Sequence, residues 1–435
     1  MENKTIVSVY GLGYVGLTLS IVLAEHDFFV IGFEKDKTKK IMLKKNKMYL
    51  HETNIESRYA KQYKKNFILD DENKNKLRSK IHVITVGTPI DKLKNLIVAP
   101  FEKILTSISN NLKKDDLLIV RSTVPIGFCN EFIIPFIKKK TNYNPGIDYN
   151  IVFAPERTIE GKALDELISN PQIIGGYSSK CNEAGSNFFR KFCNNISLVK
   201  NLESAEMCKL VDNTFRDVSF SYANEISILA DKYSVDVHEI IDTCNRNYIR
   251  NNIPRPSPGV GGPCLIKDPY IMALSARKKK FETVLISTAR KVNEKTIKHN
   301  VEKIIKHLPY PKKNHKFLFC GIAFKGNPET NDIRDSTTVD LIKNLKKKLK
   351  NVKIYAHDFI VSNKELKKLG YIPFNIQKDK NEIDAIIVAN NHKGYSFVDF
   401  NDLLKRNKTQ LIFDGWKLLY NQRFDQNIKY IGVGF

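Results

Sequence analysis

The stretch "VYGLGYVGL", Val9 to Leu17, connects an apolar strand-like segment to the beginning of a helix-like segment. Its glycines, Gly11, Gly13 and Gly16, follow the pattern G-x-G-x-x-G, which permits a tight turn and a close approach of a pyrophosphate. The helix that begins here adds free N–H groups and a partial positive charge. The triplet alone also occurs in glycine turns that bind nothing, so its context decides its meaning.

The second apolar segment, "VIGFE", supplies that context. It ends at Glu34, roughly 20 residues after the glycines, where dinucleotide sites place a carboxylate that binds the ribose hydroxyls. A carboxylate repels a 2′-phosphate, so the pattern predicts a cofactor site that favours NAD over NADP, with Lys35 beside it keeping NADP open.

The alternation of apolar and amphipathic segments predicts the domain organisation. It extends from residue 6 to about 200 and begins again at 316, as expected for βαβ units, whereas residues 203–247 carry apolar residues at helical spacing. The predicted fold class is α/β, with two Rossmann-like domains with parallel sheets joined by a long central helix. We expect an NAD-binding domain at 1–200, a central helical domain at 201–307, a linker at 308–314 and a C-terminal α/β domain at 314–435.

Composition limits the partners. The 435 residues include 71 Lys and Arg against 47 Asp and Glu, but the lysines form short scattered runs without interleaved aromatic residues, so we expect no nucleic-acid partner. No apolar run approaches the roughly 20 residues that span a bilayer, and the start lacks a signal-peptide pattern, so we expect no membrane partner and a cytoplasmic location. The seven scattered cysteines predict reduced thiols and no metal site.

One cysteine stands out, in "PSPGVGGPCLIKDP", Pro256 to Pro269. A lone cysteine more often fills a core than acts as a nucleophile. Cys264, however, follows the Gly261–Gly262 pair closely and lies in a loop where backbone can approach a ligand closely, which favours a functional thiol.

The predicted central helix carries a second candidate group. Lys209, Asn213 and Arg216 are spaced four and three residues apart and therefore share one face. By itself, this polar face is typical of a solvated helix surface. Beside a reactive cysteine, the same side chains could stabilise an alkoxide and bind an anionic substrate.

Seven segments in a fixed order give the chain a family resemblance over essentially its whole length. They are "GLGYVGL", "RSTVP", "APER", "AEMCKLVDNTFRDVSFSYANE", "GVGGPCLIKDP", "GIAFK" with "NDIRDS", and "IFDG". In this order the chain resembles the UDP-glucose/GDP-mannose dehydrogenase family. The resemblance implies oxidation of a sugar C6 alcohol to a carboxylate with two NAD⁺, and a homodimer formed through the central helical dimerisation domain.

The resemblance also implies roles for individual residues. A thiolate can capture an aldehyde as a thiohemiacetal, whose oxidation yields a thioester for water to hydrolyse. The implied catalytic residues are Cys264, Lys209, Asn213, Asp268, Glu156 and Thr123. The implied cofactor-binding residues are Gly11, Gly13, Tyr14, Val15, Gly16, Glu34, Thr88, Thr123 and Arg334. The implied substrate-binding residues are Arg157, Thr158, Lys209, Asn213, Arg216, Tyr248, Arg250, Gly261, Phe324, Lys325 and Lys417.

Three departures from the family pattern bear on the substrate. Pro263 stands where relatives often have histidine, Trp416 stands at a commonly basic position that Lys417 could replace, and the segment after Lys325 is about two residues longer than usual. Residues 205–225 and 245–262 most resemble the branch that oxidises UDP-N-acetyl-D-mannosamine, although Tyr248 replaces a histidine there. UDP-N-acetylglucosamine and UDP-glucose are the alternative substrates.

Two functions other than that of an enzyme are alternatives for this sequence. The protein could be an inactive relative that kept the fold to bind nucleotides, or a basic protein that binds nucleic acid. Retention of Lys209, Asn213, Cys264 and Asp268 together argues against the inactive protein, which has no chemical need for all four.

Overall fold

The computed structural model describes residues 4–73, 76–91, 94–309 and 314–435. The chain forms two compact units, Met1–Asp212 with Tyr270–Glu282, and Asn213–Pro269 with Thr283–Phe435. Part of the linker predicted at 308–314 lies outside the described residues. Along the described chain, no helix is long and apolar enough to cross a membrane.

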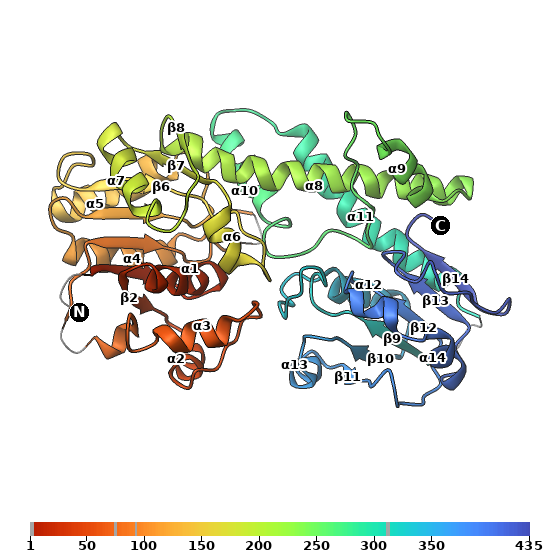
Figure 1. Cartoon of the computed structure of the whole chain (residues 1–435). Helices are drawn as coiled ribbons and strands as arrows, with labels where there is room; N and C mark the ends of the chain where they lie inside the picture. Colours follow the sequence, from red (N-terminus) through yellow and green to blue (C-terminus); the bar gives the residue numbers. More distant parts are fainter. Residues whose placement is uncertain (1–3, 74–75, 92–93, 310–313) are drawn as a thin grey trace. The chain divides into compact units, whose positions relative to one another are not determined.

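The first unit is built on an eight-stranded sheet with the order β3-β2-β1-β4-β5-β6-β7-β8. Figure 1 shows this unit in red to yellow, with helices around the sheet. Its strands are β1 (Thr5–Tyr10), β2 (Phe28–Phe33), β3 (Phe67–Leu69), β4 (Ile81–Ile84), β5 (Leu117–Val120), β6 (Asn150–Phe153), β7 (Gln172–Gly176) and β8 (Ile196–Val199). Its helices are α1 (Tyr14–Glu25), α2 (Lys37–Lys44), α3 (Ile55–Gln62), α4 (Ala99–Asn111), α5 (Ile134–Thr141), α6 (Ala163–Ser169) and α7 (Ser179–Phe189). The order of the first six strands is that of a dinucleotide-binding fold, as predicted.

The burial of the central strands explains why their sequences are nearly continuous apolar runs. Every residue of β4, β5 and β6 is buried, because helices cover both faces of a parallel sheet. Helix α1 is buried from Gly16 to Ala24, so it too is apolar around most of its circumference.

One strand pair departs from the parallel order. Strand β7 pairs with β6 in the antiparallel direction, with Val152 opposite Gly176. The chain leaves β6 at the carboxyl edge of the sheet and enters β7 from that same edge. An antiparallel strand can be joined in this way, whereas a parallel strand would need a crossover connection.

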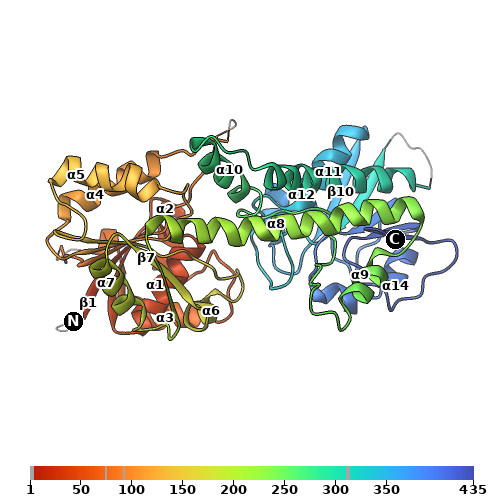
Figure 2. The same ribbon diagram turned by 90° about the horizontal axis from the view of Figure 1, so that it is seen from above.

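Helix α8 (Leu202–Tyr233), labelled in Figure 2, is the predicted long central helix. The division between the two units falls within this helix, after Asp212. The other helices of this region are α9 (Val237–Asn245), α10 (Asp268–Lys278) and α11 (Val284–Lys306). The Gly/Pro-rich loop that carries Cys264 lies between α9 and α10.

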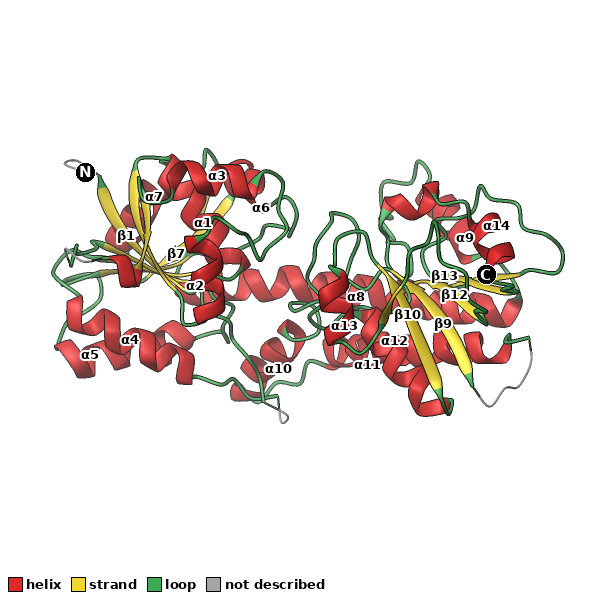
Figure 3. Cartoon of the chain, turned by 90° about the horizontal axis from the view of Figure 1, so that it is seen from below, coloured by secondary structure: helices red, strands yellow, loops and turns green. Residues whose placement is uncertain are grey.

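The second unit contains a six-stranded parallel sheet with the order β11-β10-β9-β12-β13-β14. Helices flank this sheet (Figure 3). Its strands are β9 (His315–Cys320), β10 (Val352–His357), β11 (Ile372–Pro373), β12 (Ala385–Val388), β13 (Leu411–Asp414) and β14 (Lys429–Gly432). Its helices are α12 (Thr337–Lys348), α13 (Asn363–Lys368) and α14 (Phe400–Arg406). This order repeats that of strands β1 to β6 of the first sheet, which confirms a second Rossmann-like sheet.

Candidate functional site

The glycine loop after β1 has the geometry of a tight strand-to-helix turn. Gly11 has a positive φ of 98°, which residues with side chains rarely adopt, and its amide donates to Phe33 O at 2.8 Å. A Cβ on Gly16 would lie 1.9 Å from Gly11 O, so only glycine fits there. A Cβ on Gly13 would meet no atom within 4 Å, and Gly13 is the N-cap of α1, so the space at the start of this helix is open to a ligand.

Glu34 lies next to this turn, as predicted from its place after β2. Its side chain is 7% exposed, and its two carboxylate oxygens accept from Leu12 N at 3.1 Å and Asp36 N at 3.0 Å. The carboxylate is thus fixed beside the glycine loop, where the ribose hydroxyls of a dinucleotide would bind.

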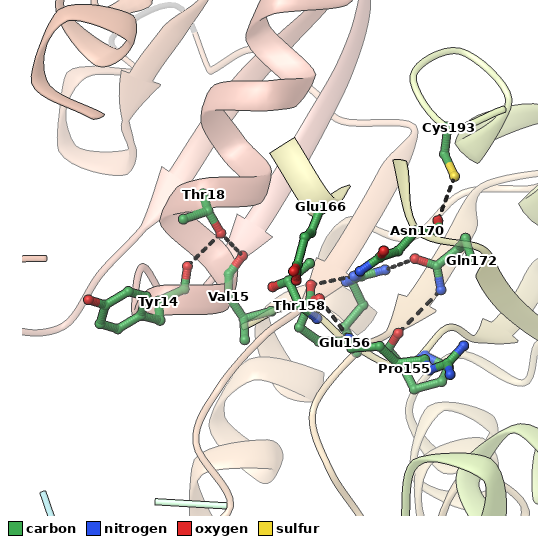
Figure 4. A network of polar contacts seen from close by, with 12 residues as sticks. Tyr14, Val15, Thr18, Pro155, Glu156, Thr158, Glu166, Asn170, Gln172 and Cys193 are labelled. Carbon is green, nitrogen blue, oxygen red and sulfur yellow. Dashed lines mark hydrogen bonds and ion pairs between the residues drawn. The ribbon is translucent and has the colours of Figure 1, made fainter. Parts of the chain in front are cut away.

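Further candidate residues gather at the carboxyl edge of the first sheet. Thr88 follows β4 and is buried, Thr123 follows β5 and is half-buried, and Glu156 follows β6 and is buried. Because β1, β2, β4, β5 and β6 are mutually parallel, these residues share an edge with the glycine loop. The residues present therefore fit a dinucleotide cofactor. Tyr14 and Val15 lie in the first turn of α1 (Figure 4).

Glu156 is the most constrained charged group at this edge. One carboxylate oxygen accepts from the buried Arg121 guanidinium at 2.5 Å, and the other accepts from the amides of Arg157 and Thr158 at 2.7 and 2.8 Å. Glu156 and Thr158 are labelled in Figure 4. Burial alone would raise the pKa of Glu156, but the charge and hydrogen bond of Arg121 and the Thr158 amide outweigh it, and the pKa is lowered. Glu156 is therefore an ionised, fully bonded carboxylate.

Lys209 of α8 is joined to this group, because its ammonium donates to the backbone carbonyl of Glu156. One residue further, Arg157 pairs with Asp212 of the same helix at 2.7 Å. The segment after β6 is thus attached to α8 through two successive residues.

Sequence reasoning missed Arg121 as part of this site. It also donates to Gln172 Oε1 at 2.8 Å and is 2% exposed. The available signal was an arginine directly after the apolar run "DLLIV", since an arginine at a buried strand end needs a carboxylate partner.

In the second unit, the Cys264 loop is packed by its glycines against the C-terminal sheet domain. Gly262 has a φ of 90°, donates to Asp335 O at 2.9 Å and would place a Cβ only 2.7 Å from the Phe324 ring. A Cβ on Gly261 would lie 2.5 Å from Asp335 O. These contacts require glycine and bring the loop around Gly261 together with Phe324, two of the predicted residues.

Cys264 lies in the turn that precedes α10, and its side chain is exposed. Its carbonyl accepts from Asp268 N at 2.9 Å. The Asp268 carboxylate is 0% exposed and accepts from Asn213 Nδ2 at 2.6 Å. The predicted residues Asn213, Cys264 and Asp268 thus belong to one connected group.

Lys325 and Arg334 follow β9, at the carboxyl edge of the second sheet. The Lys325 ammonium lies 5.6 Å from the Phe324 ring centroid. The Arg334 side chain is 60% exposed and binds the Asp332 carboxylate, with Nε 2.9 and 2.8 Å from its two oxygens. These cations are suited to an anionic ligand.

Other predicted substrate residues have different partners or are exposed. Lys417 binds Asp236 at the start of α9, while the Trp416 indole donates to Ala389 O at 3.1 Å. Tyr248 and Arg250 lie in an exposed turn and contact each other, with Arg250 Nη1 3.5 Å from the Tyr248 hydroxyl. Arg216 is exposed on α8. Among the residues that the structure describes, no group of three or more His, Cys, Asp or Glu could hold a metal ion.

The glycine loop, Glu34 and the strand order define a dinucleotide-binding enzyme fold of the dehydrogenase type. Three domain models of one family match the chain: the NAD binding domain at residues 5–193, the central domain at 203–295 and the UDP binding domain at 318–421. The chain belongs to the UDP-glucose/GDP-mannose dehydrogenase family. It is an NAD-dependent nucleotide-sugar dehydrogenase, and the UDP binding domain supports a UDP-sugar substrate.

Individual relatives span nearly the whole chain. The chain is 30% identical to the UDP-N-acetyl-D-mannosamine dehydrogenase of Pyrococcus horikoshii, over 95% of this chain and 96% of the relative. It is 28% identical to an NDP-N-acetyl-D-galactosaminuronic acid dehydrogenase of Ralstonia nicotianae, over 92% of this chain and 94% of the relative. The solved structure of the Pyrococcus horikoshii UDP-D-ManNAc dehydrogenase matches with a TM-score of 0.87 and 26% identity, covering 99% of both chains.

Proposed function

We propose that the protein oxidises the C6 hydroxyl of a UDP-sugar to a carboxylate in two steps, through a covalent bond to Cys264. The observation that carries the proposal is the connection of Cys264 to Asp268 and Asn213, one helical turn from Lys209 on α8. A thiol, a carboxylate, an amide and an ammonium are the groups that such an oxidation needs.

The first oxidation removes a proton from the C6 hydroxyl and a hydride from C6, which gives an aldehyde. The Cys264 sulfur then adds to the carbonyl carbon and forms a thiohemiacetal, whose loss of a second hydride and a proton gives a thioester. Water adds to the thioester carbonyl, the carbon–sulfur bond breaks, and the carboxylate leaves while the thiol is restored. The glycine loop and Glu34 would hold NAD⁺, which supplies a hydride acceptor when bound; each oxidation uses one NAD⁺, so NADH must leave and a second NAD⁺ must bind before the second oxidation.

We assign separate tasks to the surrounding residues. Lys209 and the Asn213 amide stabilise the alkoxide-like oxygen of the intermediates, and Asp268 holds Asn213 in place for this task. Thr123 positions water at the edge of the first sheet. Glu156 supports the hydrolysis step by orienting Lys209 through its backbone carbonyl, because its carboxylate oxygens are already bonded.

The most specific part of the proposal is the substrate, UDP-N-acetyl-D-mannosamine. Residues 205–225 and 245–262 favour it, and so does the similarity to the Pyrococcus horikoshii enzyme over nearly the full length of both chains. A site built to bind an acetamido group leaves polar groups unpaired when it receives a plain hexose, at a cost of about 1–3 kcal/mol.

We therefore expect kcat/KM for UDP-N-acetylmannosamine to exceed that for UDP-glucose by roughly 5- to 150-fold. This ratio corresponds to the free-energy cost of about 1–3 kcal/mol given above. NADH formation with purified protein and a panel of UDP-sugars measures this, and UDP-N-acetylglucosamine is the hardest competitor because it keeps the acetamido group. Equal or faster turnover of UDP-glucose would show that the substrate assignment is wrong and leave the reaction class intact.

We also propose that two copies pair through α8, in the central helical domain of residues 201–307. Six large apolar side chains lie exposed along this helix with spacings of four and seven residues: Met207, Val211, Phe215, Tyr222, Leu229 and Tyr233. Spacings of four and seven place side chains on one helical face. An exposed apolar stripe of this length is a protein-binding surface, and a second copy of α8 supplies a matching stripe.

Phe215→Glu is expected to weaken this dimer about 100-fold, because a carboxylate buried at the seam lacks a partner and costs about 3 kcal/mol. Light scattering should give the mass of two 50.0 kDa chains for the wild type and of one for the variant at low micromolar concentration. Phe397→Glu, at a side chain 88% exposed outside α8, is the matched control and should stay dimeric. A monomeric wild type, or a fully dimeric Phe215→Glu, would contradict the proposal.

A further inference from the structure

A buried polar layer between α8 and α11 holds the loop that carries Cys264. Arg290 of α11 is 3% exposed, and its guanidinium donates to Leu265 O at 3.0 Å and to Val260 O at 3.3 Å. These carbonyls lie on either side of Cys264 in the chain. One planar group therefore fixes both ends of the segment that presents the thiol.

Asp217 of α8 holds Arg290 in turn. The Asp217 side chain is fully buried and accepts from Arg290 Nη1 at 2.8 Å. The same carboxylate oxygen accepts from Asn293 Nδ2 at 2.8 Å, and Asn293 Nδ2 also donates to the Asp217 carbonyl at 3.1 Å. The guanidinium is thus held by a carboxylate that is itself attached to both helices.

Two amides extend the layer to the start of the loop. Asn224 Oδ1 accepts from Ser257 N at 2.9 Å, and Asn300 Nδ2 donates to Pro258 O at 3.1 Å. Asn224 is joined to Asn293 by a 2.9 Å hydrogen bond. The loop is therefore bound to the layer through its backbone at residues 257, 258, 260 and 265.

The loop composition explains why the chain keeps a buried ion pair here. A buried pair is a weak source of stability, since apolar residues of similar volume serve as well or better. The residues before Cys264 include Gly259, Gly261 and Gly262, which offer no side chains to pack. Their backbone must be held through its polar groups, and buried carbonyls left unbonded would cost about 1–3 kcal/mol each.

We infer that Arg290, held by Asp217, is a positioning residue that sets the place of the Cys264 thiol by bonding the backbone on both sides of it. Arg290 acts through the loop and has no contact with substrate in this role. The expected effect of Arg290 on catalysis rests on the proposed function. The expected effect of Arg290 on the loop does not, because the order of the loop can be measured without any activity.

The test compares Arg290→Lys and Arg290→Met with wild type. Lysine keeps one charge beside Asp217 but cannot bond two carbonyls and a carboxylate in a plane, whereas methionine removes all bonds. Lys291→Met, at the exposed neighbouring position of α11, is the matched control. Should Arg290→Met fail to fold, Arg290→Lys decides the question.

The first measurement is hydrogen exchange of backbone amides by mass spectrometry. We expect peptides covering residues 257–268 to exchange at least about tenfold faster in Arg290→Lys, while peptides from the first sheet keep wild-type rates. We also expect kcat to fall about 100-fold, the cost of a misplaced reacting group, with KM for NAD⁺ changed less than about threefold. Arg290→Lys should retain more activity than Arg290→Met.

Wild-type exchange in residues 257–268 in both variants would overturn the inference, and so would faster exchange spread evenly over the whole chain. Faster exchange confined to the loop with an unchanged kcat would support the positioning role and contradict the catalytic role of Cys264. Failure of the inference and failure of the proposed function thus give different results.

Discussion

Cys264→Ala is expected to lose net oxidation of the sugar to the acid by at least about 10³-fold, because the variant lacks the sulfur that holds the aldehyde during the second oxidation. Its affinity for NAD⁺ should stay within about twofold of wild type. The residues that fit the cofactor, Gly11, Gly13, Gly16 and Glu34, all lie in the first sheet unit, whereas Cys264 belongs to the second. The measurements are acid formation by chromatography and NAD⁺ binding by calorimetry.

Cys244→Ala provides the control, since Cys244 is the other exposed cysteine of the chain and lies in α9. This variant should form acid at the wild-type rate. Sustained acid formation by Cys264→Ala near the wild-type rate would refute the covalent role of the thiol.

Arg121→Met is expected to destabilise the protein by about 3–5 kcal/mol, because it leaves the Glu156 carboxylate buried without its charged partner. Urea denaturation measures this loss, with Arg190→Met, at an exposed arginine, as the control. Adding Glu156→Gln to Arg121→Met should recover part of the stability, since it removes the unpaired charge. Loss of less than about 1 kcal/mol in Arg121→Met would contradict the structural account of this pair.

The pH dependence of this variant has a definite sign. In the wild type, burial raises the pKa of Glu156, but Arg121 and the Thr158 amide lower it by more, so the pKa lies below its usual value. The contribution of Glu156 to stability is therefore present above the unfolded pKa of about 4.3 and is lost as the pH falls through the lowered folded value. Without Arg121, burial raises this pKa, so the carboxylate should destabilise the variant at neutral pH and do so less as the pH falls through the raised folded value.

The sequence was most informative where one local segment determines the structure. The glycine pattern and Glu34 lie in consecutive elements, and the structure places the carboxylate 3.1 Å from the Leu12 amide of the glycine loop. The long helix α8 was likewise predicted from periodic apolar residues, which indicate a helix over a long span without any tertiary information.

Pairings between distant segments were not accessible in this way. The contact of Arg121 with Glu156 depends on β5 and β6 being neighbours in register, and the contact of Lys417 with Asp236 joins residues 181 positions apart. The same holds for Arg290, which the sequence shows only as one of many basic residues on an amphipathic helix. The antiparallel direction of β7 also depends on the path of the connecting segment, because apolar runs carry no sign of direction.

The central claim is a four-electron oxidation of the sugar whose second step takes place on the Cys264 sulfur. The most direct test is the number of NADH molecules formed per molecule of UDP-N-acetylmannosamine consumed. Absorbance at the NADH band gives the first quantity, and chromatography of the UDP-sugar gives the second, in a reaction followed to completion with excess NAD⁺. The account predicts two NADH per sugar, with a carboxylate as the product and no accumulated aldehyde. One NADH per sugar with free aldehyde as the product would contradict it.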